Sequence, residues 1–238
     1  MRGIITAALG LTATILAGCT PPKAPPAPNA TASSAARPAA PARPEDTVRA
    51  AEAYVKAALG STCDMNDRKD IPLNATDQDG VSHFVYKFSY KLGGDDAGAP
   101  PHEIELYQMF CAMGAYNIQS VFLLRDPDSG QEFQLLSFAR PDTSYDYTDD
   151  TDTKLKAPPV VTGFASDITL TNAKFDPKTM TISSRPLGRG VGDLWEAGQW
   201  RFSSGEFQLV RYEIDPTEDG GSGQSSQPES YVVYQAGP

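Results

Sequence analysis

Residues 82–92 read SHFVYKFSYKL, and the alternation in this stretch decides the fold class. Large apolar or aromatic side chains occupy the even positions from Phe84 onward, whereas the odd positions include His83, Lys87 and Lys91. A period of two residues is typical of a strand with one buried and one solvated face, because successive side chains point to opposite sides. The stretch therefore predicts a half-buried β-strand that carries His83 on its polar side.

Most of the chain after this stretch has the same character of short strands separated by turns. Residues 117–125 and 131–138 carry apolar side chains on both faces, which predicts central strands, and the turn sequence 126–130 between them contains Pro127 and Gly130. Turns at this spacing favour a mainly β fold, an antiparallel meander that forms a sandwich or a partly closed barrel. The other predicted strands are residues 104–112, 168–175, 180–184, 199–202, 206–214 and 231–235.

One amphipathic helix is predicted ahead of the strands, over residues 46–59. Acidic side chains at Glu45 and Asp46 lie at the positive end of its dipole, and Gly60 is a suitable terminator. A single amphipathic helix must pack its apolar side against another element. The residues on that side are Val48, Ala51, Val55 and Leu59.

The first nineteen residues have the pattern of a bacterial lipoprotein signal. Arg2 precedes an apolar run over residues 4–16, which ends in Leu16-Ala17-Gly18-Cys19. This is the pattern of secretion, and the apolar run is too short to be a comfortable membrane span. We therefore expect residues 1–18 to be a signal peptide and Cys19 to be lipidated after cleavage.

The residues after Cys19 predict an anchored tether and then one folded domain. Residues 20–44 contain eight prolines and many alanines, a composition that favours an extended spacer over a packed core. Thr20, rather than an aspartate, follows the lipidated cysteine, which favours the outer membrane, with the domain facing the periplasm or the cell surface. The expected organisation is a lipidated tether over residues 19–44 and a single β-rich domain over 45–238, with a flexible loop at 217–228.

Charge and motif content exclude several function classes. The formal net charge of −10 argues against nucleic acid as a partner, so membrane attachment must come from the acyl chains. The acidic stretch 77–80 resembles half of a calcium loop, but Ala75 and Tyr86 occupy positions that need ligands. A second acidic segment, residues 142–152, lacks the glycine turn of such a loop. We therefore expect no metal and no cofactor.

Two cysteines remain if Cys19 is lipidated, and an oxidising compartment predicts that Cys63 and Cys111 are bonded to each other. Closing a loop of this length contributes about 4 kcal/mol to stability. The alternative is a cysteine hydrolase in which His83 or His102 acts as the base. No cysteine-protease motif surrounds either thiol, and His83 is predicted on the polar side of its strand.

Several motifs in a fixed order carry a resemblance to a known family. They are CAMGAYN at residues 111–117, Asp176 and Thr179 at a hairpin, GRGVGD at 188–193, and the aromatic pair Trp200 and Phe202. Over residues 61–214 the chain resembles the C-terminal part of the uncharacterised proteobacterial envelope family called domain of unknown function 1176. That family has a cysteine after Gly-Asp where this chain has Leu194, so the resemblance implies that a second disulfide of its relatives is absent here.

The segment 188–193, which we call the glycine-rich loop, is the main candidate site. A strand rather than a helix is predicted after it, so it lacks the context of a phosphate loop. In one interpretation the loop is structural: its glycines permit a tight backbone path, and charged hydrogen bonds of Arg189 and Asp193 stabilise it. In the other, the loop faces a ligand, and Arg189 binds an anion or a carboxylate group of that ligand. The candidate binding residues are Tyr116, Asn117, Arg189, Asp193 and Trp200.

Three functional hypotheses follow. None of them names a catalytic residue that lies in a recognised catalytic motif. The favoured one is a tethered, non-catalytic binding module for an envelope protein or a small ligand. The second is a periplasmic hydrolase acting on cell wall or saccharide, with Asp193 and Glu196 as its carboxylates. The third is an inhibitor of a wall-degrading envelope enzyme.

Overall fold

The computed structural model describes residues 44–63, 71–74, 81–127, 130, 133–148, 150–218, 220 and 230–237. Within these ranges the chain forms one α-helix, one short 3-10 helix and twelve strands. The predicted signal peptide, Cys19 and the tether as far as residue 43 lie outside the described residues, as does most of the predicted loop 217–228. None of the helices in the described ranges has both the length and the apolar character that a membrane span requires.

Helix α1 (Pro44–Leu59) confirms the predicted amphipathic helix and begins two residues earlier. Gly60 has a φ of +54°, a conformation that favours glycine, and it begins the 3-10 turn η1 (Gly60–Thr62). Val48, Ala51 and Val55 are buried, as their spacing predicts.

All the described strand pairs within the sheets are antiparallel, and the strands form three separate sheets, which agrees with the sandwich alternative. The first sheet has the order β1-β2-β3-β4, with β7 also paired to β3. Its strands are β1 (Phe84–Tyr90), β2 (His102–Met113), β3 (Ile118–Arg125), β4 (Gln134–Leu135) and β7 (Leu170–Thr171).

The second sheet has the order β12-β11-β10-β9-β8. Between β10 and β11, Ser204 and Gly205 both have positive φ, which is the backbone of a two-residue hairpin turn that matches strand twist. A separate two-stranded sheet pairs β5 (Phe138–Ser144) with β6 (Val160–Asp167). The strands of the second sheet are β8 (Lys174–Asp176), β9 (Thr181–Ser184), β10 (Trp195–Ser203), β11 (Glu206–Asp215) and β12 (Tyr231–Gln235).

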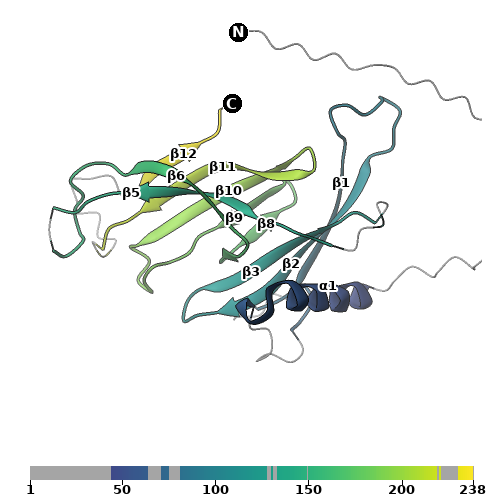
Figure 1. The fold of residues 1–238 in the computed structure, drawn as a ribbon, viewed down its shortest axis with the longest axis horizontal. Helices are drawn as coiled ribbons and strands as arrows, with labels where there is room; N and C mark the ends of the chain where they lie inside the picture. The colour runs from purple at the N-terminus through teal and green to yellow at the C-terminus, as the bar shows by residue number, and fades with distance from the viewer. Residues whose placement is uncertain are drawn as a thin grey trace, which may run out of the picture. The chain divides into compact units, whose positions relative to one another are not determined.

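The first sheet is buried on both faces, with α1 on one side and the second sheet on the other (Figure 1). Because neighbouring residues on a strand point in opposite directions, β2 and β3 supply apolar side chains to two core clusters, one on each face of the sheet. Val48, Ala51 and Val55 pack with Tyr107, Met109, Val121 and Leu123 on the helix side. The other cluster includes Leu106, Phe122 and Leu124 with Trp200, Phe202 and Ile214 of the second sheet.

Two predicted strands are divided between sheets. The predicted strand 131–138 is only Gln134–Leu135 in the first sheet, and Phe138 starts β5, where its ring packs between Phe122 and Trp200. The predicted strand 168–175 is interrupted at Asn172, whose φ is +51°, so that β7 and β8 lie in different sheets. The packing of the Phe138 ring and the left-handed backbone of Asn172 therefore override the local preference of each segment for one continuous strand.

Strand β6 has no counterpart among the predicted strands. Its Val160 and Phe164 are exposed, and its residues alternate between exposed and half-buried without a clear apolar face. Its partner β5 contains Pro141, a residue that argues against a strand in sequence. Neither segment therefore carries the local pattern that identifies a strand.

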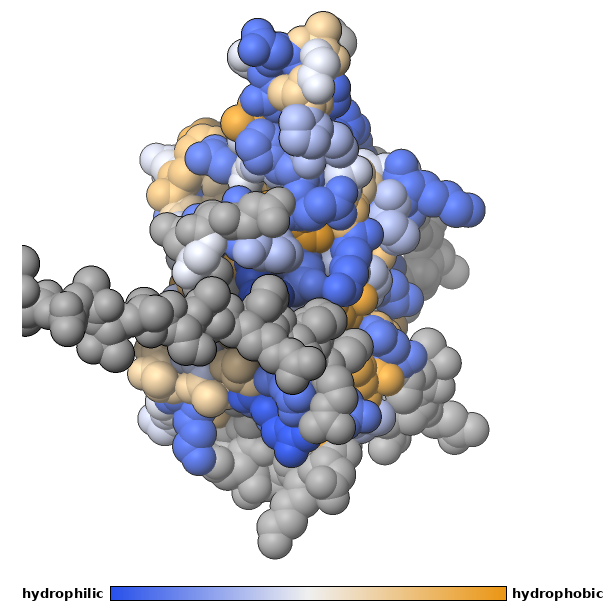
Figure 2. Space-filling view, turned by 90° about the vertical axis from the view of Figure 1, so that its right-hand side faces the viewer, coloured by the Kyte–Doolittle hydropathy of each residue, from blue (hydrophilic) through white to orange (hydrophobic). Residues whose placement is uncertain are grey.

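Figure 2 shows the side of the molecule that lies to the right in Figure 1. Hydrophilic residues cover most of the described surface there, and apolar residues form small, separate areas. Scattered apolar residues of this kind are normal on a protein surface and do not by themselves mark an interface.

Candidate binding cleft beside the glycine-rich loop

The two main sequence motifs, residues 111–117 and 188–193, meet in space. Asn117 donates from Nδ2 to the carbonyl oxygen of Leu187 at 2.8 Å and accepts at Oδ1 from the backbone N–H of Leu187 at 3.1 Å. The hydroxyl of Tyr116 donates to the carbonyl oxygen of Gly188 at 3.0 Å. The turn before β3 therefore holds the chain at the start of the glycine-rich loop.

Asn172, which sequence reasoning missed, joins a third segment to this junction. Its Nδ2 donates to Asn117 Oδ1 at 2.9 Å and to the carbonyl oxygen of Arg185 at 3.0 Å. Its Oδ1 accepts from the backbone N–H of Ile118 at 2.9 Å. Asparagine tolerates the left-handed conformation found here, so this side chain both ends β7 and orients Asn117.

Close packing explains two of the loop glycines. A Cβ atom on Gly188 would lie 2.6 Å from Leu194 Cδ2, and one on Gly190 would lie 3.2 Å from the ring of Tyr116. Gly192 instead has a φ of +78°, where a side chain is strained whatever space is available. The loop is thus a tightly packed structure in which Tyr116 covers Gly190.

Arg189 and Asp193 contact each other, as the tied-loop hypothesis expects. Nε of Arg189 lies 3.5 Å from Oδ1 of Asp193, and its Nη1 lies 2.5 Å from Glu218 Oε2. Asp193 is buried, and its Oδ2 accepts from the backbone N–H of Gly220 at 2.9 Å. Since two carboxylates already engage the Arg189 guanidinium, this geometry favours a role in holding the loop over that of an anion clamp.

A cleft with a volume of about 410 Å³ lies beside the loop. Gly188 of the loop and the two residues that flank the loop, Leu187 and Leu194, form one wall of the cleft. Trp195 and Glu196, at the start of β10, follow directly in the chain. Ligand pockets in proteins have volumes of roughly 300–1,000 Å³, so the cleft is large enough for a small molecule or a side chain.

The β5–β6 sheet supplies the charged pair Arg140 and Asp167 to the same cleft. Nε of Arg140 lies 3.0 Å from Asp167 Oδ2, and Nη2 lies 3.1 Å from Asp142 Oδ1. Partial burial acts to lower the pKa of Arg140, but the nearby carboxylates, Asp167 foremost, outweigh it and raise that pKa. Arg140 therefore carries a positive charge in the cleft, next to the carboxylates of Asp167 and Asp142.

Glu196 is held by the hydroxyl of Tyr212, which donates to Glu196 Oε2 in a short hydrogen bond. Burial raises the pKa of Tyr212 strongly, and the charge of Glu196 and the hydrogen bond to it add to the effect. Tyr212 consequently remains a donor, and Glu196 presents an acceptor to the cleft. Asp215, at the end of β11, is a third carboxylate in the lining.

Trp195 has the face of its ring covered by a cation. The guanidinium carbon of Arg185 lies 4.3 Å from the ring centroid, within the range of a cation–π contact. Trp200, the tryptophan singled out in sequence, is instead buried between the sheets, where its Nε1 donates to the carbonyl oxygen of Ala139 at 2.9 Å. Trp200 is not among the residues that line the cleft.

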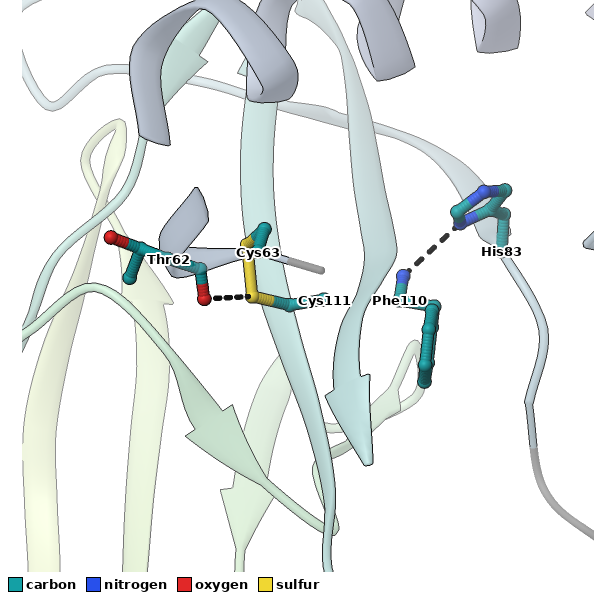
Figure 3. Close-up of a disulfide and its surroundings, with 5 residues drawn as sticks. All are labelled: Thr62, Cys63, His83, Phe110 and Cys111. Carbon is teal, nitrogen blue, oxygen red and sulfur yellow. Dashed lines mark hydrogen bonds between the residues drawn. A yellow bond between two sulfur atoms is a disulfide. The ribbon is translucent and has the colours of Figure 1, made fainter. Parts of the chain in front are cut away.

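The prediction that His83 lies on the polar side of its strand is wrong. His83 is fully buried, because helix α1 covers the odd-numbered side at the start of β1. Its Nδ1 accepts from the backbone N–H of Phe110 at 3.1 Å (Figure 3). Nε2 therefore carries the proton and donates to Glu52 Oε1 at 3.0 Å. Burial lowers the pKa of His83, and the Glu52 carboxylate opposes that effect.

The predicted disulfide between Cys63 and Cys111 is present, with an S–S distance of 2.03 Å (Figure 3). It links the end of η1 to β2, next to Phe110, and both cysteines are buried. Cys111 Sγ lies 3.7 Å from the carbonyl oxygen of Thr62, which is a packing contact because a disulfide sulfur has no hydrogen to donate. A bonded Cys111 offers no thiolate for the cysteine-hydrolase alternative.

Metal ligation was predicted to be absent, and in the described ranges no three His, Cys, Asp or Glu side chains lie together in an arrangement that could hold a metal ion. The half calcium loop at residues 77–80 lies outside those ranges, and so does Asp149 of the second acidic segment.

The fold and site define a β-sandwich domain with a ligand-sized cleft next to two family motifs. The chain belongs to the family described as "Protein of unknown function (DUF1176)", whose model matches residues 11–234, a longer stretch than the motifs alone cover. It is 34% identical over 68 residues to "Uncharacterized protein YpfG" of Escherichia coli strain K12. That match spans 29% of this chain and 20% of the relative. No solved structure matches the chain.

Proposed function

We propose that this protein is a lipid-anchored envelope protein whose β-rich domain binds a ligand in the cleft beside the glycine-rich loop, without converting it chemically. Lipidation of Cys19 attaches the chain to the outer membrane, and the proline-rich residues 20–44 hold the domain away from it. Support for the anchor comes from the lipoprotein pattern over residues 1–19.

One observation carries the binding function. The motifs at residues 111–117 and 188–193 are held together by hydrogen bonds from Tyr116 and Asn117, and the junction they form borders a cleft of about 410 Å³. A rigid wall built from segments far apart in the chain can orient a bound molecule without the loss of conformational entropy that ordering a flexible site would require.

Labelling with palmitate tests the anchor. We expect incorporation into the wild-type chain and none into a Cys19→Ser variant, while a Cys63→Ser variant still takes label. Recovery of the wild-type protein with an uncleaved, unacylated N-terminus would contradict the anchored location.

Thermal melting with fractions of an envelope extract tests the binding function. A ligand that binds only the folded state raises the melting temperature by mass action. We expect one or more fractions to raise the melting temperature of the wild type, and to raise that of Glu196→Gln less. The control variant is Glu206→Gln, which changes an exposed acid outside the cleft and should be stabilised as much as the wild type. Equal stabilisation of all three proteins would place binding elsewhere, and no stabilisation by any fraction would count against the function.

A second function, hydrolysis of a cell-wall or saccharide substrate, is favoured by the carboxylates of the cleft. Glu196 lines it as that hypothesis requires, but Asp193 does not, and Asp167 and Asp215 are the acids that accompany Glu196. Glycosidases use two carboxylates on either side of the scissile bond. Release of soluble sugar from purified peptidoglycan by the wild type, and its loss in Glu196→Gln, would favour hydrolysis over binding alone.

A further inference from the structure

The charges that line the cleft are unequal. Among the lining residues there are three carboxylates, on Asp167, Glu196 and Asp215, and one cation, Arg140. Arg140 is already paired with Asp167 and with Asp142. The lining therefore has an excess of negative charge, and an anionic ligand would meet repulsion from several carboxylates at once.

Glu196 is the carboxylate best placed to receive a ligand. Its hydrogen bond in the structure is with a neutral donor, the Tyr212 hydroxyl on Oε2, and the charge of Glu196 also interacts with the nearby Arg140 guanidinium, which is itself paired with Asp167 and Asp142. A carboxylate has about four acceptor positions, and one hydroxyl occupies one of them. A charged donor in the cleft would thus form a charge-assisted hydrogen bond with a pre-oriented acceptor.

Two aromatic side chains, Trp195 and Tyr145, line the same cleft. The Arg185 guanidinium already covers the ring of Trp195, with its central carbon 4.3 Å from the ring centroid, so Trp195 borders the ligand position without offering that face to a second cation. Indole and phenol rings attract ammonium groups electrostatically and pack against the carbon chain that carries them.

We infer that the cleft binds its ligand through a primary ammonium group, which donates to Glu196 beside the ring of Trp195. The inference rests on the proposed binding function and names the chemical class of the ligand, a small amine or an amine-bearing side chain. The volume of about 410 Å³ holds the ammonium group together with the carbon chain or ring attached to it.

Nuclear magnetic resonance of the ¹⁵N-labelled chain tests the inference, because the protein has two tryptophans and so two indole N–H signals. The probes are Nα-acetyl-lysine amide, which carries one ammonium group, and its neutral Nε-acetylated derivative. We expect the first to move the Trp195 signal with saturation and the second to bind about tenfold more weakly, the loss expected for one charge-assisted hydrogen bond. The buried Trp200 signal is the internal control and should stay in place.

Two variants complete the experiment. Glu196→Gln keeps the shape of the side chain and should weaken binding of the charged probe by about tenfold, whereas Glu206→Gln should leave it unchanged. Melting temperatures of both variants show whether the fold is kept. Equal binding of the charged and neutral probes, undiminished binding by Glu196→Gln, or no movement of Trp195 with the charged probe would overturn the ammonium inference. The extract experiment judges the binding function separately, since it makes no assumption about ligand charge.

Discussion

Nε2 of His83 lies 3.0 Å from Oε1 of Glu52, and this contact ties helix α1 to the first sheet. The other ring nitrogen accepts from the backbone N–H of Phe110, so the ring is neutral and has its single proton on Nε2. Protonation of Nδ1 would remove the acceptor that Phe110 uses in a fully buried position. The junction between helix and sheet is therefore sensitive to pH.

The first prediction is that stability declines on mild acidification. Burial lowers the pKa of His83 in the folded state below its ordinary value of about 6.5. In the pH window between that value and the lower pKa of the folded state, the unfolded chain therefore binds more protons than the folded chain does. Stability is thus fully present above that window and falls through it, with a limiting slope of about 1.4 kcal/mol per pH unit. Urea unfolding at a series of pH values measures the slope.

Variants identify the source of that slope. His83→Gln should remove most of it, while His102→Gln, which changes the other histidine, should leave it in place. Glu105 and Glu213 also have lowered pKa values, but their effect begins at more acidic pH, near the ordinary carboxylate values. An unchanged slope in His83→Gln would contradict this assignment.

Removing the disulfide should lower the free energy of unfolding by about 4 kcal/mol, because the bond closes a loop between residues separated by 48 positions. Chemical unfolding of the Cys63→Ala/Cys111→Ala variant, compared with the oxidised and reduced wild type, measures the loss. The variant and the reduced protein should agree. A loss below about 1 kcal/mol would contradict this account and would mean that the unfolded chain keeps structure in this loop without the bond.

Gly198→Ala should destabilise the second sheet by about 1–3 kcal/mol, since an added Cβ would lie 2.2 Å from Cη2 of the buried Trp200. Gly163→Ala is the matched control, because no atom lies within 4 Å of a Cβ at that strand position. Thermal unfolding of the two variants should differ clearly. Equal melting temperatures would show that Trp200 can move aside.

Arg189→Ala should lower stability by about 1–2 kcal/mol, because it leaves the buried Asp193 carboxylate without its ion pair. Asp193→Asn removes the charge that needs pairing, so the double variant should be more stable than the sum of the single changes allows. A double-mutant cycle by urea unfolding measures that coupling. Strict additivity would show that Arg189 does not stabilise the loop through Asp193.

Local patterns in the sequence were sufficient for much of the fold. Alternation in residues 82–92 and the apolar stripe of the helix each depend on neighbours in the chain, and both elements are present. The pairing of Cys63 with Cys111 could also be predicted, because the lipoprotein pattern predicts an oxidising compartment and assigns Cys19 to lipidation, which leaves two thiols and one intramolecular pairing.

The candidate site was predictable only in part. Tyr116, Asn117, Arg189 and Asp193 do lie at one junction, but Trp200 is a core residue and the cleft uses Trp195 instead. Arg140 and Asp167 lie on β5 and β6, whose sequences lack the alternation of a strand. Asn172 could have been suspected only from its tolerance of a positive φ.

The amino-acid sequence by itself determined the β class, the amphipathic helix, the disulfide and the family, because periodicity, turn chemistry and motif order are properties of neighbouring residues. Only the tertiary structure decided that His83 is buried, that residues 131–138 divide between two sheets, and that Glu196 and Trp195 share a cleft with Arg140. Those outcomes depend on contacts between segments tens of residues apart, and the free energy of such packing has no signature in local sequence.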